Sequence, residues 1–371
     1  MIKLNELNTL PVPTFRWLRV NELAIDDEID FEARPYGKDF LQMAPQGELI
    51  QRQMPYNGLT DRPIMKDLMD SAGFGVSEDL VGFADTFHNS GMYIEIPRGI
   101  KVTEPIMVGY KPDSDNPTVI DNNLIIAHEH SEVTIVMDIA SSANASAVHN
   151  GVTRVVAKEG AMVTVIKIQR MNDSSFHFDS NLALVGSGAR VDYIVAELGS
   201  KKAAVNYTCR LSEGAQSHIN TIYLGNGDRH LDLSFLMEHQ GRRSTSSIEA
   251  RGALRDMASK TFKGTIDFKK GADKSEGSES EHVLLFDRTV KSISVPLLLC
   301  SEDDVKGQHA ISSGKVDQDK LFYLMSRGFS RGEAMVLLAE ASFSDVIDKI
   351  YPKSLEDLIR AEISGRLLHG N

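Results

Sequence analysis

The chain has 371 residues, of which 42% are hydrophobic and 25% are charged, and its formal net charge is −12. This composition is ordinary for a globular protein, and the negative charge argues against a nucleic-acid-binding protein, which needs a basic surface. The N-terminus lacks the apolar core of a signal peptide, and no segment approaches the roughly 20 apolar residues that span a bilayer. We therefore expect a cytoplasmic protein that binds neither nucleic acid nor a membrane.

Residues 1–90 combine helix and loop patterns and form the first predicted domain. Residues 60–63, Thr-Asp-Arg-Pro, are typical of a helix start, and residues 77–87 predict a second short helix. Three apolar residues near the N-terminus could dock this region onto a core: Phe15, Trp17 and Leu18.

From about residue 91 the pattern changes to short β-rich runs separated by Gly, Asn and Asp turns. No long helical patterns alternate with these runs, which disfavours a βαβ sheet. Residues 274–281, KSEGSESE, are predicted to be a flexible acidic loop because they lack apolar side chains. The predicted strands are residues 92–96, 106–110, 124–127, 133–137, 152–156, 163–168, 182–185, 191–196 and 219–224.

A weak repeat underlies these strands. Gly160-Ala161, Gly188-Ala189 and Gly214-Ala215 each follow one predicted strand and precede another, at spacings of 28 and 26 residues. The glycine suits a turn and the alanine suits a tight corner, so each pair could mark one turn of a coiled β architecture. Periodicity alone also allows a sandwich or a barrel, but the repeat favours a parallel β-helix over residues 91–313.

The segment 295–334 marks the change from strands to helices. An apolar run and an acidic turn are followed by a lone histidine, His309, among small residues. Asp317 is a suitable N-cap for a helix, and Gly328 suits the position after its C-cap. Ser330 and Glu333 have the spacing of a capping box for the next helix.

The C-terminal domain is predicted to comprise residues 314–371. Apolar residues at helical spacing from residue 316 onward predict three helices, the last one capped by Ser354.

The same C-terminal segment carries a family resemblance. Val-Pro, then Asp-Asp-Val, then His309 and Gly314, then LFYLMSRG before Glu333-Ala334 resembles the C-terminal signature of the SufB/SufD family of iron–sulfur cluster assembly scaffolds. Residues 93–108 and 262–272 also look like the first strand and the last repeats of that family's coil. The resemblance implies a mainly β protein, with a right-handed parallel β-helix core and helical segments at both ends.

His309 is the first candidate site residue. On its own, a lone histidine is more typical of a hydrogen-bonded structural role. The family has a histidine at this position that is linked to cluster assembly, so the resemblance implies that His309 binds iron or relays a proton. Two residues near His309 differ from the family pattern. Ala310 replaces the glutamate that SufB-like members tend to have, and Gly307 replaces a cysteine of some SufD-like members.

Cys300 is the second candidate. A cysteine at the end of an apolar strand is typically a small buried residue, and its alternative role is a thiolate that holds persulfide or iron. Nine residues separate Cys300 from His309, so the two could approach each other across a turn. Alignment without gaps through Pro296 puts Glu281 where SufB-like members have an essential cysteine, which makes the chain most similar to SufD. We name Cys300 and His309 as the metal-binding and cofactor-binding residues.

The cysteine count limits how a cluster could be held. Cys209 and Cys300 form no CxxC pair, so we expect no disulfide framework, and Cys209 is predicted to lie in a strand of the core. Two cysteines cannot supply the usual four thiolates of an iron–sulfur cluster. A cluster would therefore be transient and interfacial, with ligands from a partner, a second copy, histidines or carboxylates, and the isolated chain need hold none.

The resemblance also implies partners. A SufC-like ATPase would dock on the helical tail, and a SufB-like subunit, or a second copy of the chain, would pair with the β-helix end that carries Cys300 and His309. The sequence contains no GxxxxGK[ST], GxSxG or HExxH motif, so we expect a scaffold and not an enzyme.

Two alternatives remain open from the residues alone. One is a β-helix carbohydrate-active enzyme that uses Asp303 and Asp304, although adjacent residues on a strand point to opposite faces and make a poor acid–base pair. The other is a structural β-helix that oligomerises without metal. His128 and His130, if they lie at a strand edge, share a face and form a possible metal pair.

Overall fold

The computed structural model describes residues 4–21, 25, 27–32, 34–38, 40–42, 49–53 and 73–368. The helix predicted to start at residues 60–63 lies outside these residues. The strands are β1 (Leu41–Gln42), β2 (Ile50–Gln53), β3 (Met92–Ile96), β4 (Ile106–Tyr110), β5 (Thr118–Ala127), β6 (Glu132–Ile139), β7 (Val148–Ala157), β8 (Met162–Gln169), β9 (Phe176–Val185), β10 (Arg190–Glu197), β11 (Lys202–Leu211), β12 (Gln216–Gly225), β13 (His230–His239), β14 (Thr245–Leu254), β15 (Ser259–Phe268), β16 (Glu276–Leu285), β17 (Lys291–Cys300) and β18 (Lys306–Lys315). The helical elements are η1 (Arg16–Leu18), α2 (Glu78–Phe87), α3 (Gln318–Ser326), α4 (Arg331–Ile347) and α5 (Lys353–Leu368).

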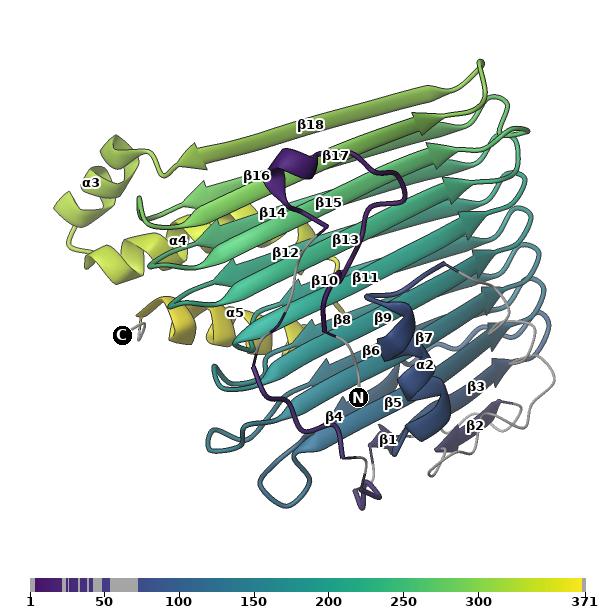
Figure 1. The fold of residues 1–371 in the computed structure, drawn as a ribbon, viewed down its shortest axis with the longest axis horizontal. Helices are drawn as coiled ribbons and strands as arrows, with labels where there is room; N and C mark the ends of the chain where they lie inside the picture. Colours follow the sequence, from purple (N-terminus) through teal and green to yellow (C-terminus); the bar gives the residue numbers. More distant parts are fainter. Residues whose placement is uncertain are drawn as a thin grey trace.

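The strands form two nine-stranded sheets, with orders β1-β4-β6-β8-β10-β12-β14-β16-β18 and β17-β15-β13-β11-β9-β7-β5-β3-β2. The pairs β1·β4 and β2·β3 are antiparallel, whereas the pairs that join β3 to β18 are parallel. From β3 onward successive strands lie in opposite sheets, so each turn of the chain adds one strand to each sheet (Figure 1). The predicted parallel β-helix is confirmed; its right-handed sense and the three-domain division stay predictions.

The Gly-Ala repeat marks one corner of this coil. Gly160, Gly188 and Gly214 have φ values of +64°, +62° and +65°, in the left-handed region that favours glycine. The amide of Gly160 donates to the carbonyl of Ser187, and that of Gly188 donates to Glu213, so successive corners are joined along the coil. The alanine after each glycine is fully buried. The spacing in the sequence is thus the length of one turn.

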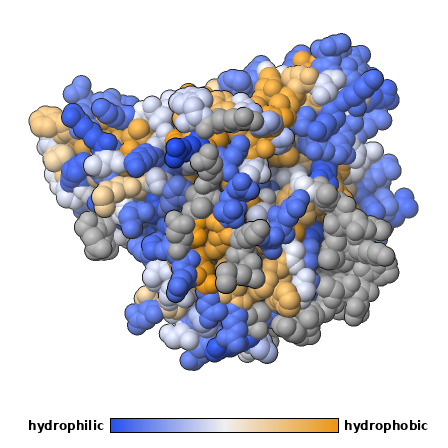
Figure 2. Space-filling view, viewed as in Figure 1, coloured by the Kyte–Doolittle hydropathy of each residue, from blue (hydrophilic) through white to orange (hydrophobic). Residues whose placement is uncertain are grey.

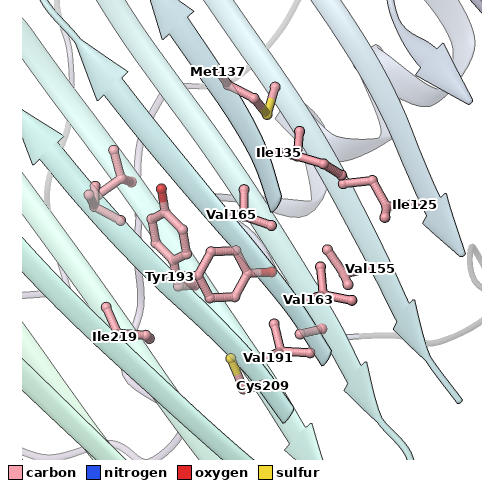
Figure 3. Close-up of a cluster of buried hydrophobic side chains, with 14 of the residues drawn as sticks. Ile125, Ile135, Met137, Val155, Val163, Val165, Val191, Tyr193, Cys209 and Ile219 are labelled. Carbon is pink, nitrogen blue, oxygen red and sulfur yellow. The ribbon is translucent and has the colours of Figure 1, made fainter. Parts of the chain in front are cut away.

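Apolar side chains fill the space between the two sheets. Ile135, Val165, Tyr193 and Ile219 come from successive strands of one sheet and stack in register (Figure 3). Cys209, in β11 of the opposite sheet, is fully buried in the same core, which confirms its predicted place. The burial of these rows is the main stabilising contribution to the coil.

The C-terminal helices cover the outer face of the β4–β18 sheet. Phe343 of α4 and Ile359 of α5 belong to one buried cluster with Ile166, Ile194 and Ile222 of that sheet. The predicted three-helix tail is therefore confirmed for the described residues.

The helix ends agree with the predicted caps, with one exception. The side chain of Asp317 accepts hydrogen bonds at the start of α3, and Gly328 follows its C-cap with φ +100°. Ser330 and Glu333 form both hydrogen bonds of the capping box of α4. The prediction for Ser354 is wrong, because α5 already begins at Lys353 and Ser354 lies inside its first turn.

The N-terminal residues cover the other sheet. Helix α2 begins after its N-cap Ser77 and packs on β5 and β7. Phe15 and Leu18 pack against Val295 on the outer face of β17, as predicted. Trp17 is 80% exposed, so the prediction that it docks onto the core is wrong.

Candidate functional site

The last turn of the solenoid is uncovered. Strand β17 pairs only with β15, and β18 pairs only with β16, so no strand of the described residues lies beyond them (Figure 1). Paired residues of parallel neighbours point to the same face of a sheet. The inward-facing side chains of β17 and β18 therefore have a layer of core beneath them and none above. We call this layer the open end.

His309 lies at the open end, at the top of a core column. One residue from each strand of the β4–β18 sheet belongs to this column, in order: Ile106, Ile135, Val165, Tyr193, Ile219, Ile248, Glu279 and His309. The first six are buried and apolar or aromatic, Glu279 is 3% exposed, and His309 is exposed. The column thus changes from apolar to ionisable in its last two turns.

The residues beneath His309 correct the predicted acidic loop. Residues 276–285 form β16, with Ser278 and Ser280 outward and exposed and Glu279 and Glu281 inward and buried. The loop prediction is wrong because residues 276–281, which lack apolar side chains, are held in the strand by its ladders to β14 and β18. The alternation of serine with glutamate is the sequence signal for this strand. It is easily missed because here the charged residues, and not the serines, lie on the buried face.

The carboxylate of Glu281 is fully engaged. It lies 2.6 Å from the Nζ of Lys260, and both side chains are fully buried. The hydroxyl of Tyr223 donates to one of its oxygens at 2.6 Å, and Ser294 of β17 donates to the other. Burial lowers the pKa of Lys260, which the charge of Glu281 opposes, and raises the pKa of Tyr223. This network ties the last turn to the one beneath it.

Glu279 is held differently. Its carboxylate reaches across the interior to Gly264 of β15, where an added Cβ would lie 2.1 Å from Oε1, so a larger residue at position 264 would collide with it. Oε1 is buried and has no hydrogen-bond partner among the described residues. Burial, and then the nearby charge of Glu281, raises the pKa of Glu279 to about 8. A buried carboxylate oxygen without a partner is unfavourable and is uncommon in folded proteins.

Cys300 also lies at the open end, but away from His309. It ends β17, pairs with the inward-facing Phe268, and is exposed. Since Gly264 and Glu279 face each other, their partners in the last turn, Pro296 and His309, face each other as well. Cys300 lies four residues beyond Pro296, roughly 13 Å along the strand. The structure therefore does not bring Cys300 and His309 side by side, and their roles as ligands stay predictions.

The other candidates from the sequence do not form a site. His128, Glu129 and His130 form a turn after β5, where His128 is hydrogen-bonded to Glu95 at 2.8 Å and His130 has φ +58°. The strand alternation assumed for the two imidazoles is therefore wrong. Asp303 and Asp304 are exposed in the turn between β17 and β18. Within the described ranges, no group of three or more His, Cys, Asp or Glu side chains could hold a metal ion.

Comparison with known proteins decides the family. The family model described as SUF system FeS cluster assembly, SufBD core domain, matches residues 110–342, from the end of β4 into α4. The chain belongs to the SufBD family. The open end, with both Cys300 and His309, falls within the SufBD core.

Relatives of known family are similar at low identity. The iron-sulfur cluster assembly protein SufD of Bacillus subtilis is 26% identical over 307 residues, which cover 82% of this chain and 69% of that protein. SufB of the same organism is 24% identical over 75% of this chain and 61% of its own length. A SufBD family protein of Mycobacterium leprae is 26% identical over 78% of this chain and 34% of its own length. This SufBD chain thus spans only part of its relatives.

In the part of the SufBD chain that the structure describes, no helix combines the length and apolar character needed to cross a membrane.

Proposed function

We propose that this SufBD chain is a cytoplasmic scaffold subunit of a SUF iron–sulfur cluster assembly complex, in which nascent clusters form at a subunit interface. The open end is the observation that carries the proposal. It leaves inward-facing positions and two strand edges uncovered, and such surfaces are usually covered by a partner. A SufB-like subunit, or a second copy of the chain, would cover it.

The ligand supply supports an interfacial cluster. Cys300 is exposed, whereas the thiol of Cys209 is fully buried, and burial raises its pKa to about 12. One accessible thiol cannot hold a cluster that usually needs four thiolates. The cluster is cargo, so the chain needs to contribute only some of its ligands. Cys300 and His309, which lie apart within one chain, would each meet ligands of the partner, which contributes the rest.

The helical tail offers a second surface for the proposed SufC-like ATPase. Helix α3 is amphipathic in sequence, yet its apolar side chains are largely outside: Phe322 is 73% exposed. Figure 2 shows hydrophobic residues at the end of the molecule where α3 lies. Exposed apolar residues grouped in this way are typical of protein-binding surfaces. The group comprises Phe322, Tyr323, Met325, Phe329 and Leu337.

Anaerobic reconstitution with iron and sulfide tests the interfacial cluster. We expect a visible iron–sulfur chromophore only when a SufB-like partner or a second copy is present, and its loss in Cys300→Ala and in His309→Ala. Gln308→Ala is the matched control, because Gln308 neighbours His309 on β18 and is also exposed. A chromophore that survives both substitutions, or none in any combination, contradicts the proposed site.

Binding to a SufC-like ATPase tests the tail. We expect Phe322→Ala to weaken binding at least about tenfold, since a buried aromatic anchor at an interface typically contributes about 2 kcal/mol or more. Met162→Ala is the control, because Met162 is also exposed but begins β8, whereas α3 follows the end of β18, a parallel strand of the same sheet. Equal binding by both variants would remove this surface from the proposal.

A further inference from the structure

We propose that Glu279 and His309 form half of a binding site for iron(II), which a partner subunit or water completes at the open end. This inference rests on the proposed function, because it assigns a ligand to the same interface. It names a residue, Glu279, that neither the sequence pattern nor the family comparison singles out.

The two side chains share one face of neighbouring strands. Glu279 of β16 and His309 of β18 are Cα partners in a parallel pair, so their backbones lie about 4.8 Å apart and their side chains point inward together. His309 is exposed above the core and Glu279 is buried directly below it. An ion that reaches His309 from solvent or from a partner therefore meets the Glu279 layer next.

Glu279 lacks the cationic partner that several other buried carboxylates have. Asp179 is paired with Lys167 at 2.9 Å, and Asp232 with Lys263 at 3.0 Å. Glu281, two residues along the same strand, takes the ammonium of Lys260. The Oε1 of Glu279 is left without any hydrogen bond among the described residues. A bound cation would satisfy an oxygen that the protein itself leaves unpaired.

The space around Glu279 is kept open on the opposite sheet. Gly264 faces the carboxylate, and any side chain there would occupy its place. In the layer above, Pro296 takes the equivalent position and cannot donate a backbone hydrogen bond. Neither opposing residue supplies a side-chain cation or hydrogen-bond donor, so the carboxylate is left available to a ligand.

The donor set indicates the class of ion. One imidazole nitrogen and one carboxylate oxygen suit first-row divalent metals such as iron(II), whereas magnesium and calcium prefer oxygen ligands alone. Two ligands leave most coordination positions open, so the ion would be held weakly by this chain and shared with the partner. Weak, shared binding suits an ion that has to be passed into a cluster.

Cobalt(II) is a suitable probe, because its visible absorption reports its ligands without cluster chemistry. The full chain, alone and in complex with its SufB-like partner or a second copy, is titrated anaerobically with cobalt(II) and with iron(II). We expect Glu279→Gln and His309→Gln each to weaken binding at least about tenfold. Glu276→Gln, an outward-facing change on the same strand, should leave it unchanged.

The outcomes separate this inference from the proposed function. Binding that Glu279→Gln changes less than twofold, or no binding by the wild-type complex, overturns the half-site even where a cluster still forms. If metal binding needs both Glu279 and His309 but the chain never forms a cluster with any partner, the half-site is supported and the scaffold proposal is contradicted. His309→Gln keeps the test valid if Glu279→Gln misfolds, because His309 is exposed.

Discussion

The middle of the solenoid and its open end use the same backbone for different purposes. Tyr193 and Ile219 fill their column in the middle, where neighbouring turns cover them on both sides. Glu279 and His309 occupy equivalent positions at the end, where coverage stops. The repeat therefore fixes where a side chain points, and the position along the coil decides whether neighbouring turns cover that side chain on both sides or on one side only.

Thiol labelling gives the largest contrast between the two regions. Cys300 at the open end should react with a thiol reagent in the native protein, whereas Cys209 should react at least about 1,000-fold more slowly. Labelling of Cys209 requires opening of the core and ionisation of a thiol whose pKa burial raises to about 12. Timed mass spectrometry measures both rates, and Cys300→Ala should leave a single slow site. Comparable rates at the two thiols would contradict the burial described for β11.

Asp179→Ala should break the middle of the coil. The substitution leaves the ammonium of Lys167 buried without its counter-ion, which typically lowers the free energy of unfolding by about 3–5 kcal/mol. Urea denaturation followed by circular dichroism measures the change. Asp303→Ala, in the exposed turn before β18, is the control and should change it by less than about 0.5 kcal/mol. Similar losses for both would mean that the two regions do not differ in this way.

Glu197 makes the stability of the middle depend on pH. Burial, and then the charge of Asp179, raises the pKa of Glu197 to about 8, whereas the unfolded chain ionises near its ordinary value. Its stabilising contribution is therefore present at low pH and is lost as pH rises toward 8. Relative to Glu197→Gln, the wild type should lose about 1.4 kcal/mol of unfolding free energy per pH unit between pH 5 and 8.

Denaturation at pH 5, 6, 7 and 8 measures this difference between wild type and Glu197→Gln. Glu104→Gln is the control, because Glu104 is an exposed glutamate outside the core. A difference that stays flat across the window would mean that Glu197 is not held neutral by the core.

The smallest expected effect is at the top of the column. His309→Ala should change the free energy of unfolding by less than about 0.5 kcal/mol, because the side chain is exposed. Ile248→Ala, two turns below in the same column, should lower it by about 2–5 kcal/mol. Thermal unfolding of both variants measures the pair. A large loss for His309→Ala would show that the open end is packed within the single chain.

The sequence predicts the coil better than the site. The Gly-Ala repeat is visible because glycine suits a left-handed corner, but the same corner is made by His130, Arg243 and Lys274 elsewhere, so the repeat fades along the chain. The caps of α3 and α4 follow from local hydrogen bonding, which short spacings encode.

What the sequence does not predict depends on contacts between distant residues. β16 is predicted as a loop because its buried residues are glutamates, and the residues that they face, Lys260 and Gly264, come from β15 of the opposite sheet. The separation of Cys300 from His309 depends on how the two sheets face each other, which a nine-residue spacing does not state.

The exposed Trp17 has a practical consequence. It is the only tryptophan of the chain, and the neighbouring Phe15 and Leu18 pack on the outer face of β17, the last strand of its sheet. An exposed indole emits at longer wavelength than a covered one, so a partner that covers the last turn and reaches Trp17 would shift the ultraviolet emission to shorter wavelength. Such a partner would be detected with no dye attached and no cysteine consumed.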